Sequence, residues 1–315
     1  MLSCAEAVIT VKSEANFRTN YSFWVKLAST ASVIVAFSLI AMKLVAWLHT
    51  ESASMLASMT DSILDSGASV FSFFAIRYAL QPADEEHRFG HGKAESLAAL
   101  AQSAFIAGSS MLLIFHSIEQ LIEGPTLPNV GMGIWVSVIA IALTLVLITI
   151  QRIAIKQTDS QAIRADHLHY QSDILLNLAV IIALFLSAYG FLWADSVFAI
   201  GIAFYLIMGA IKIGLAAFNS LMDRELPEIL QNEIVTIAQQ IEGVNGLHGL
   251  RTREAGPTRF IQLHIELDDS LSLLKAHAIS DDVEAALMER FPNADIIVHM
   301  DPEIVAKVEG SLSTR

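Results

Sequence analysis

Residues 58–67 read SMTDSILDSG and place two acidic side chains, Asp61 and Asp65, within an otherwise apolar window near residues 54–79. The i, i+4 spacing brings both carboxylates to one face of a helix. Even on a lenient insertion scale, an acidic group at the centre of a membrane-spanning helix costs about 3 kcal/mol. Such groups are usually kept for a function, so this stretch predicts a helical membrane protein with a functional site inside its bundle.

A second pair with the same spacing, His169 and Asp173, lies in LHYQSDILL at residues 168–176. Together the two pairs offer three carboxylates and one imidazole, a four-ligand set that Zn²⁺ binds with tetrahedral geometry. Ca²⁺ prefers six to eight oxygen ligands, whereas Fe²⁺, Cd²⁺ and Co²⁺ remain candidates because affinity alone separates them poorly from Zn²⁺. The alternative is that these groups only join helices through hydrogen bonds, but two such pairs in one chain favour a metal site.

Metal binding to these groups is coupled to protons, because the ligands must be deprotonated before they bind a cation. An imidazole ordinarily titrates near pH 6.5, so protons and metal compete at His169 in the physiological range. A site that exchanges Zn²⁺ for protons while it opens to alternate membrane faces is an antiporter.

The composition of the 315-residue chain is that of a membrane protein. Hydrophobic residues make up 54% of it, charged residues 16%, and the mean hydropathy is +0.55, whereas a soluble domain carries about 25% charged residues. Apolar windows long enough to cross about 30 Å of hydrocarbon predict six spans, near residues 25–48, 54–79, 95–121, 131–155, 168–191 and 195–219. The net charge of −13 disfavours nucleic acid as a partner and suits a protein that handles cations.

The distribution of basic residues predicts the orientation of the spans. Three connections, near residues 50, 126 and 192, carry no Lys or Arg, whereas the other connections carry several. Basic connections face the cytoplasm by the positive-inside rule. Both termini are therefore expected on the cytoplasmic side.

Polarity divides the sequence into four segments. Residues 1–23 are polar and show no periodicity, which predicts an irregular N-terminal arm, and residues 24–221 contain the six predicted spans. Residues 222–305 have the pattern helix, strand, strand, helix, strand, which predicts a small cytoplasmic α+β domain. Residues 306–315 form a C-terminal tail.

Two weaker candidate metal sites lie outside the spans. The loop after the second window contains Asp84, His87 and His91, which could bind a metal or simply belong to a solvated polar loop. The C-terminal segment contains further candidate ligands, namely His248, His264, His277, His299 and Asp301. Spacing alone does not show that these side chains converge, because they lie on different predicted strands and on a helix.

Three other polar residues of the spans are predicted to take no part in metal binding. Asp166 and His167 flank the second pair on other helix faces and are expected at the membrane interface. Lys43 is expected to extend its ammonium outward to the interface.

Five strings of the sequence are long and specific enough to compare with known families. They are PADEEHRFGHGKAESLAALAQS at residues 82–103, LHYQSD at 168–173, SLMDRELP at 220–227, LRTREAGPTRFIQLHIEL at 250–267 and IIVHMDP at 296–302. These strings resemble the cation diffusion facilitator family, in particular its bacterial iron and zinc efflux pumps. The resemblance implies a homodimer in the bacterial inner membrane that exports Zn²⁺, Fe²⁺ or Cd²⁺ in exchange for protons. It also implies a ferredoxin-like or metallochaperone-like C-terminal domain that mediates dimerisation.

The same resemblance assigns residues to three metal sites and one charge pair. The transport site would consist of Asp61, Asp65, His169 and Asp173. The loop site would consist of Asp84, His87 and His91. The cytoplasmic binuclear site would consist of His248, His264, His277, His299 and Asp301. The charge pair, which in the family locks the bundle at the cytoplasmic junction of the dimer, would consist of Lys93 and Asp223.

The chain departs from the family pattern at two positions near the proposed cytoplasmic site. Gly249 stands where an Asp commonly follows the first histidine, and Met300 stands where a Gln is common. The first change removes a ligand or an outer hydrogen-bonding group, and the second alters the hydrogen bonds around the ligands.

Two other classes of membrane protein are weaker interpretations. A membrane metallohydrolase or di-iron oxidase would carry a His-Glu-x-x-His motif or several Glu-x-x-His motifs, and the sequence has neither. A cation channel would be expected to use rings of acidic side chains, whereas chelation by paired Asp and His slows conduction. The sequence therefore favours a secondary active transporter over an enzyme or a channel.

Overall fold

The computed structural model describes residues 4–50, 53–123 and 131–306, except residues 188, 190 and 192. The chain divides into two compact units. One unit comprises residues 22–218, and the other comprises residues 219–315 together with 1–21. Each unit is described by itself.

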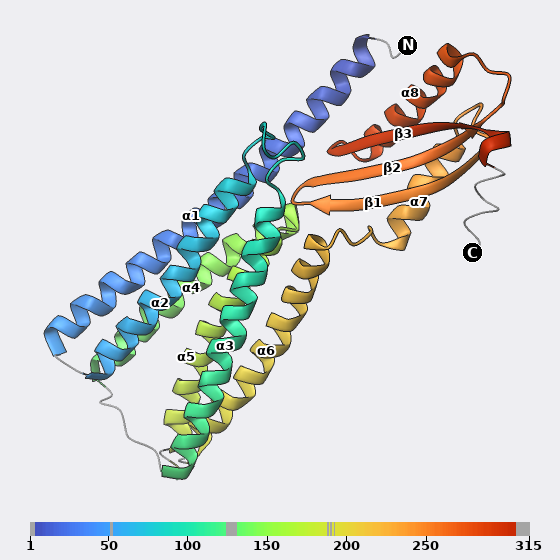
Figure 1. The fold of residues 1–315 in the computed structure, drawn as a ribbon. Helices are drawn as coiled ribbons and strands as arrows, with labels where there is room; N and C mark the ends of the chain where they lie inside the picture. Colours follow the sequence, from blue (N-terminus) through green and yellow to red (C-terminus); the bar gives the residue numbers. More distant parts are fainter. Residues whose placement is uncertain are drawn as a thin grey trace. The chain divides into compact units, whose positions relative to one another are not determined.

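The first unit is built from long helices (Figure 1). Their bounds are α1 Cys4–Thr50, α2 Ala53–Ala79, α3 Lys93–Glu123, α4 Gly131–Thr158, α5 Gln161–Ser187 and α6 Ala194–Leu221. Helix α1 begins at Cys4, so the prediction of an irregular arm up to residue 23 is wrong. The arm contains no Gly or Pro, and adding residues to an existing helix costs far less than nucleating a new one.

Four segments among the described residues are long and apolar enough to cross a membrane. They are Thr19–His49 in α1, Lys93–Ile122 in α3, Val138–Thr158 in α4 and Ala194–Leu221 in α6. Helices α2 and α5 fall outside this set, and they are the two helices that carry the paired ionisable residues. Six membrane spans therefore remain a prediction, although a helical membrane region is confirmed.

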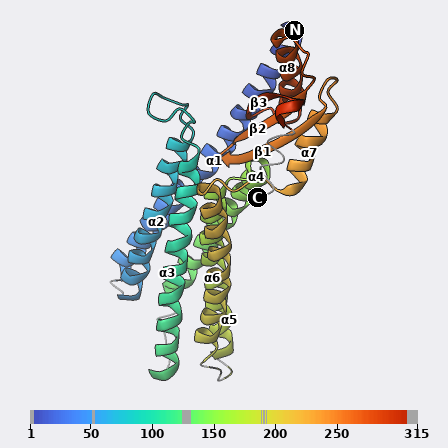
Figure 2. The same ribbon diagram turned by 45° about the vertical axis from the view of Figure 1, so that its right-hand side comes forward.

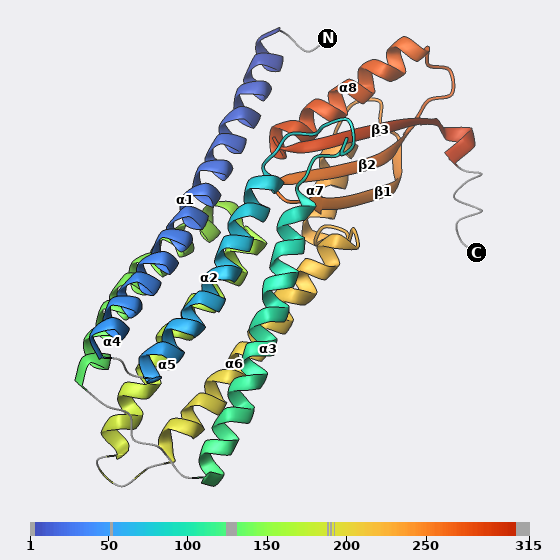
Figure 3. The same ribbon diagram turned by 60° about the vertical axis from the view of Figure 1, so that its left-hand side comes forward.

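Small residues allow close packing of α3, α5 and α6. Ala99, Ala165 and Ala217 are fully buried and form one cluster among these three helices. A Cβ added at Gly209 would lie 2.8 Å from a methyl group of Leu168. Such short side chains are typical of helix contacts in membranes, where backbones approach closely. Helices α3 and α6 lie side by side in Figures 1 and 3.

The second unit contains a three-stranded sheet and two helices. Their bounds are α7 Glu228–Gln239, β1 Gly246–Ala255, β2 Thr258–Leu267, α8 Leu273–Arg290 and β3 Ala294–Pro302. The strand order is β1-β2-β3, with β1 antiparallel and β3 parallel to β2. Helix α8 connects the two parallel strands, because a parallel pair needs a crossover. The predicted order of helices and strands in this α+β unit is confirmed.

One face of the sheet is buried against helices, and the opposite face is more exposed. Along β2, Ile261, Leu263 and Ile265 are almost completely buried, whereas the alternate residues His264 and Glu266 are only half-buried. Helix α7 contacts β1, α8 contacts β3, and the two helices contact each other, so they cover the same face (Figure 2). Because side chains alternate along a strand, His264 and Glu266 lie on the face opposite the helices.

Candidate metal centres

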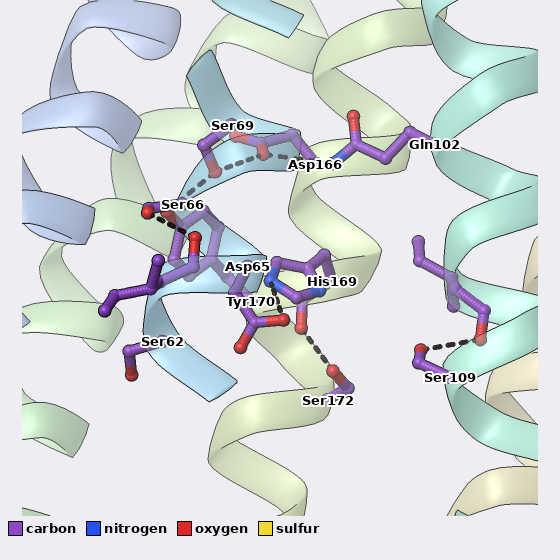
Figure 4. Close-up of polar contacts among 12 residues, drawn as sticks. Ser62, Asp65, Ser66, Ser69, Gln102, Ser109, Asp166, His169, Tyr170 and Ser172 are labelled. Carbon is purple, nitrogen blue, oxygen red and sulfur yellow. Dashed lines mark hydrogen bonds and ion pairs between the residues drawn. The ribbon is translucent and has the colours of Figure 1, made fainter. Parts of the chain in front are cut away.

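Three of the four residues predicted for the intramembrane site lie together between α2 and α5. One ligand atom from each of Asp65, His169 and Asp173 lies within 4.8 Å of the other two. His169 Nε2 is 3.7 Å from an oxygen of Asp65, and Figure 4 shows the two side chains turned toward each other. Asp61 belongs to α2, one turn before Asp65, but its side chain lies outside the described residues. Its part in the site remains a prediction.

The donor set of this cluster fits a divalent cation. His169 is buried, and its Nε2 atom makes no hydrogen bond to any group in the described part of the chain. A buried polar atom without a partner is costly unless a ligand satisfies it. Two carboxylates and one imidazole at this separation are the hard oxygen and borderline nitrogen donors that Zn²⁺ accepts. The cluster can therefore hold a metal ion with one further ligand.

Two predictions for polar residues near this cluster are wrong. Lys43 donates to Ser62 Oγ at 2.6 Å and to the Ser58 carbonyl at 3.1 Å, so its ammonium is held against α2 and does not extend outward from the helices. Asp166 is 2% exposed and accepts hydrogen bonds from neighbouring helices, so its side chain faces the interior of the bundle and not outward. The rotation of each helix about its own axis decides which neighbours its side chains contact. The spacing of residues in the sequence does not give that rotation.

The loop between α2 and α3 brings together all three residues predicted for the loop site. One ligand atom from each of Asp84, His87 and His91 lies within 4.8 Å of the other two. The backbone N–H of His87 donates to Asp84 at 2.6 Å and is the main reason that the pKa of this exposed carboxyl is lowered. His91 Nδ1 lies 3.2 Å from the Pro82 carbonyl, and its Nε2 lies 3.2 Å from Asp84. A donor role for Nδ1 leaves Nε2 as the ligand atom, as in many metal-binding histidines.

Strand register aligns three of the histidines in the C-terminal unit. His248 on β1 pairs with His264 on β2, which in turn pairs with His299 on β3. The ring centroids of neighbours in this row are 5.1 and 4.7 Å apart. Directly paired residues point to the same face of a sheet, so the row lies on the face opposite the helices.

Asp301 connects the three histidines of this row. One of its oxygens lies 2.7 Å from His264 Nδ1 and 3.4 Å from His248 Nε2, and the other lies 3.2 Å from His299 Nε2. Ligand atoms of His248, His264 and Asp301 all lie within 4.8 Å of one another. Asp301 is buried, whereas the side chain of His299, two residues earlier on the same strand, is largely exposed. The arrangement can hold a metal ion on the open face of the sheet.

Glu266, which the sequence did not predict as part of this site, contacts the same group through His248. Its side chain lies 3.1 Å from His248 Nδ1, and it occupies the register position between Gly246 on β1 and Asp301 on β3. A Cβ at Gly246 would lie 2.3 Å from a carboxylate oxygen of Glu266, so glycine provides the space for this side chain. The spacing of His264 and Glu266, two residues apart on one strand, was the available signal.

His277 is not brought to the other histidines within the described chain. It lies on α8 with 63% of its side chain exposed, and its Nδ1 is 3.6 Å from Asp281. Its assignment to the cytoplasmic site remains a prediction.

The predicted charge pair would join the two compact units. Asp223 lies just after α6 with a φ of 55°, and one of its oxygens is 3.5 Å from a nitrogen of Arg253. Lys93 begins α3 in the other unit. Pairing between Lys93 and Asp223 remains a prediction.

Gly249 is required by the shape of the β1 strand beside the histidine row. Its φ is +62°, it lies at an irregularity of the β1–β2 register, and an added Cβ would be 2.9 Å from His264 Cδ2. We expect Gly249→Asp to lower the metal affinity of this site by about tenfold because the new side chain displaces the His264 ring. Isothermal titration of the full-length protein, with the other two sites disabled, measures the effect.

A matched control for this substitution is Gly256→Asp. Gly256 has a φ of +57° in the turn between β1 and β2, so the change adds similar backbone strain away from the histidines. An unchanged or higher metal affinity in Gly249→Asp would contradict this prediction and show that the acidic side chain is accommodated beside His264.

Two family models match the chain. The cation efflux transmembrane domain matches residues 29–222, and the cytoplasmic domain of cation efflux proteins matches residues 226–303. These matches cover both compact units of the structure.

Curated relatives match nearly the full chain. A cation-efflux pump FieF of Yersinia enterocolitica is 51% identical over 92% of this chain and 96% of its own length. A FieF of Salmonella choleraesuis is 49% identical over 92% of this chain and 97% of its own length. A solved structure of CzrB (Zn form) is 30% identical over 26% of this chain and 93% of its own length, with a TM-score of 0.25.

Proposed function

Because the chain belongs to the cation efflux family, the cation diffusion facilitators, and is thus a membrane transporter and not an enzyme, we propose that it exports Zn²⁺ in exchange for protons. The observation that supports this proposal is the cluster of Asp65, His169 and Asp173 between α2 and α5. It combines a buried histidine, ligand atoms close enough to share one ion, and a histidine nitrogen that makes no hydrogen bond within the described chain. Asp61 is the proposed fourth ligand.

The ligand types favour zinc as the substrate. Two or three carboxylate oxygens and one imidazole nitrogen suit tetrahedral Zn²⁺, and Fe²⁺ or Cd²⁺ can use the same donors. Binding requires deprotonated ligands, so each metal ion that enters competes with protons for the same lone pairs. Proton release on one side of the membrane and proton uptake on the other would couple the two fluxes.

The remaining predicted features complete the proposed transporter. We place it in the bacterial inner membrane as a homodimer with six spans per chain and both termini in the cytoplasm, as the basic connections suggest. The Asp84–His87–His91 loop cluster and the His248–His264–Asp301 cluster would bind regulatory or structural Zn²⁺. Metal at the second cluster regulates transport only if it binds two states of the protein unequally.

Uptake of metal by everted membrane vesicles tests this function. Vesicles that contain the protein should take up Zn²⁺ with saturable, slow kinetics, and Fe²⁺ and Cd²⁺ should compete for the same uptake. Vesicles from cells without the protein provide the background. Uptake that rises linearly with metal concentration would contradict a transporter with a chelating site and favour a channel.

A further inference from the structure

Asp166 is a buried carboxylate that joins α5 to four other helices. Its Oδ2 atom accepts hydrogen bonds from Ser32 of α1 at 2.5 Å and from Gln151 of α4 at 2.8 Å. Its Oδ1 atom accepts hydrogen bonds from Ser69 of α2 at 3.2 Å and from Gln102 of α3 at 3.1 Å. Figure 4 shows Ser69 and Gln102 converging on Asp166 from opposite sides.

Such an arrangement satisfies a carboxylate that is only 2% exposed. An ionised carboxylate offers about four acceptor positions, and four donors from four helices fill them. A buried charge without such donors would be strongly destabilising. Because the oxygens are already occupied, Asp166 is poorly placed to bind a metal ion itself, and it does not belong to the ligand cluster formed by the described residues.

The position of Asp166 links it to the transport site. It lies three residues before His169 on α5, and Ser69 lies four residues after Asp65 on α2. Residues three and four apart occupy the same helix face on adjacent turns. The Ser69–Asp166 hydrogen bond and the Asp65–His169 contact are therefore neighbouring contacts between the same two helices.

Tyr170 strengthens the contact between α2 and α5 at the level of Asp166. Its hydroxyl lies 3.0 Å from Ser69 Oγ and donates to the Ser32 carbonyl at 3.2 Å. Tyr170 is 3% exposed, so this hydrogen-bonded group is also shielded from solvent within the unit. A sliding or rotation of α2 along α5 would break these hydrogen bonds and would also change the distance between Asp65 and His169.

We infer that Asp166 is a positioning residue that fixes α2 against α5 and thereby holds Asp65 at ligand distance from His169. This inference rests on the proposed function, because it assigns Asp166 to the metal affinity of the proposed transport site. Metal ligands usually depend on surrounding hydrogen bonds, and loss of such an outer partner typically lowers metal affinity by about 10- to 100-fold. Asp166 acts through helix position and not through a direct bond to a ligand.

Zinc titration of purified full-length protein tests this role. Alanine substitutions disable the loop site at Asp84 and His87 and the cytoplasmic site at His248 and His264. The zinc binding that is measured then comes from the proposed transport site. Asp166→Asn should weaken zinc binding by about tenfold, the lower end of the range for loss of a direct outer partner of a ligand, because the amide presents a donor to groups that are themselves donors and the effect reaches the ligands only through helix position. Thermal unfolding in detergent is measured in parallel to separate stability from affinity.

Two conservative serine variants keep the test informative if Asp166→Asn does not fold. Ser69→Ala removes the donor on α2 and should weaken zinc binding, whereas Ser38→Ala removes a hydrogen bond within α1 and should leave zinc binding unchanged. Equal zinc affinity in the parent protein and Ser69→Ala, with only a lower melting temperature, would overturn the inference. Absence of zinc binding in the parent protein would instead contradict the proposed transport site and, with it, this role.

Discussion

Asp173→Asn is expected to lower the rate of zinc transport by at least about 100-fold. The substitution keeps the size of the side chain but replaces a charged oxygen ligand with a neutral amide. Loss of an outer partner of a metal ligand already costs about 10- to 100-fold, so loss of a ligand should reach or exceed the upper value. The initial rate of zinc uptake into vesicles with reconstituted protein, normalised to the amount of protein, provides the measurement.

Asp195→Asn is the matched control for this prediction. Asp195 lies in the first turn of α6, where an acidic side chain interacts favourably with the helix dipole and is not part of any ligand cluster in the described residues. We expect this variant to transport zinc at nearly the rate of the parent protein. Transport by Asp173→Asn within a few-fold of the parent rate would exclude Asp173 as an essential ligand.

Asp61→Asn extends the same experiment to the fourth proposed ligand. A loss as large as that in Asp173→Asn would support a tetrahedral site in which Asp61 and Asp65, one turn apart on α2, are both ligands. A normal transport rate would show that the three described residues suffice, with the fourth position left to another group.

A pH difference of one unit across the vesicle membrane is expected to support about tenfold zinc accumulation for each proton exchanged per metal ion. One pH unit corresponds to about 1.4 kcal/mol per proton, which is equivalent to a tenfold ratio of concentrations. The vesicle interior must be the acidic side, so that protons leave as zinc enters. The size of the final zinc gradient therefore reports the number of protons in the cycle.

This measurement requires control of the membrane potential. Exchange of Zn²⁺ for a single proton moves net charge, and a potential of 100 mV changes the energy by about 2.3 kcal/mol per charge. A potassium ionophore with equal potassium on both sides holds the potential near zero, and a protonophore that removes the pH gradient should abolish accumulation. Zinc that only equilibrates to equal concentrations under an imposed pH gradient would contradict antiport.

The sequence predicted the helices that carry the proposed transport ligands because helical spacing is a local property. Asp65, His169 and Asp173 could be assigned to common helix faces from their positions alone, and the structure brings ligand atoms of all three together. The same reasoning failed for Asp166. It was expected on another face of α5 and at the interface, but it shares the face of His169, three residues later, and α1, α2, α3 and α4 supply its hydrogen bonds.

In the C-terminal unit the sequence predicted the strands but not their register. His248, His264 and His299 form a row only because β1 and β3 align on β2 at those residues. A shift of one residue would turn a histidine toward the hydrophobic core. The packing of Ile261, Leu263 and Ile265 against the helices sets the buried face of β2 and therefore places His264 and Glu266 on the open face.

The sequence by itself determined a helical membrane region, two pairs of ionisable residues on helix faces and a small α+β domain. These features follow from hydrophobic length and from periodicities of a few residues, which depend on local backbone geometry. Only the tertiary structure decided that Asp166 is buried among five helices, that Lys43 contacts α2 and that Glu266 joins the histidine row. Helix rotation and strand register depend on packing of the whole unit, so residues far apart in the sequence decide which polar groups meet.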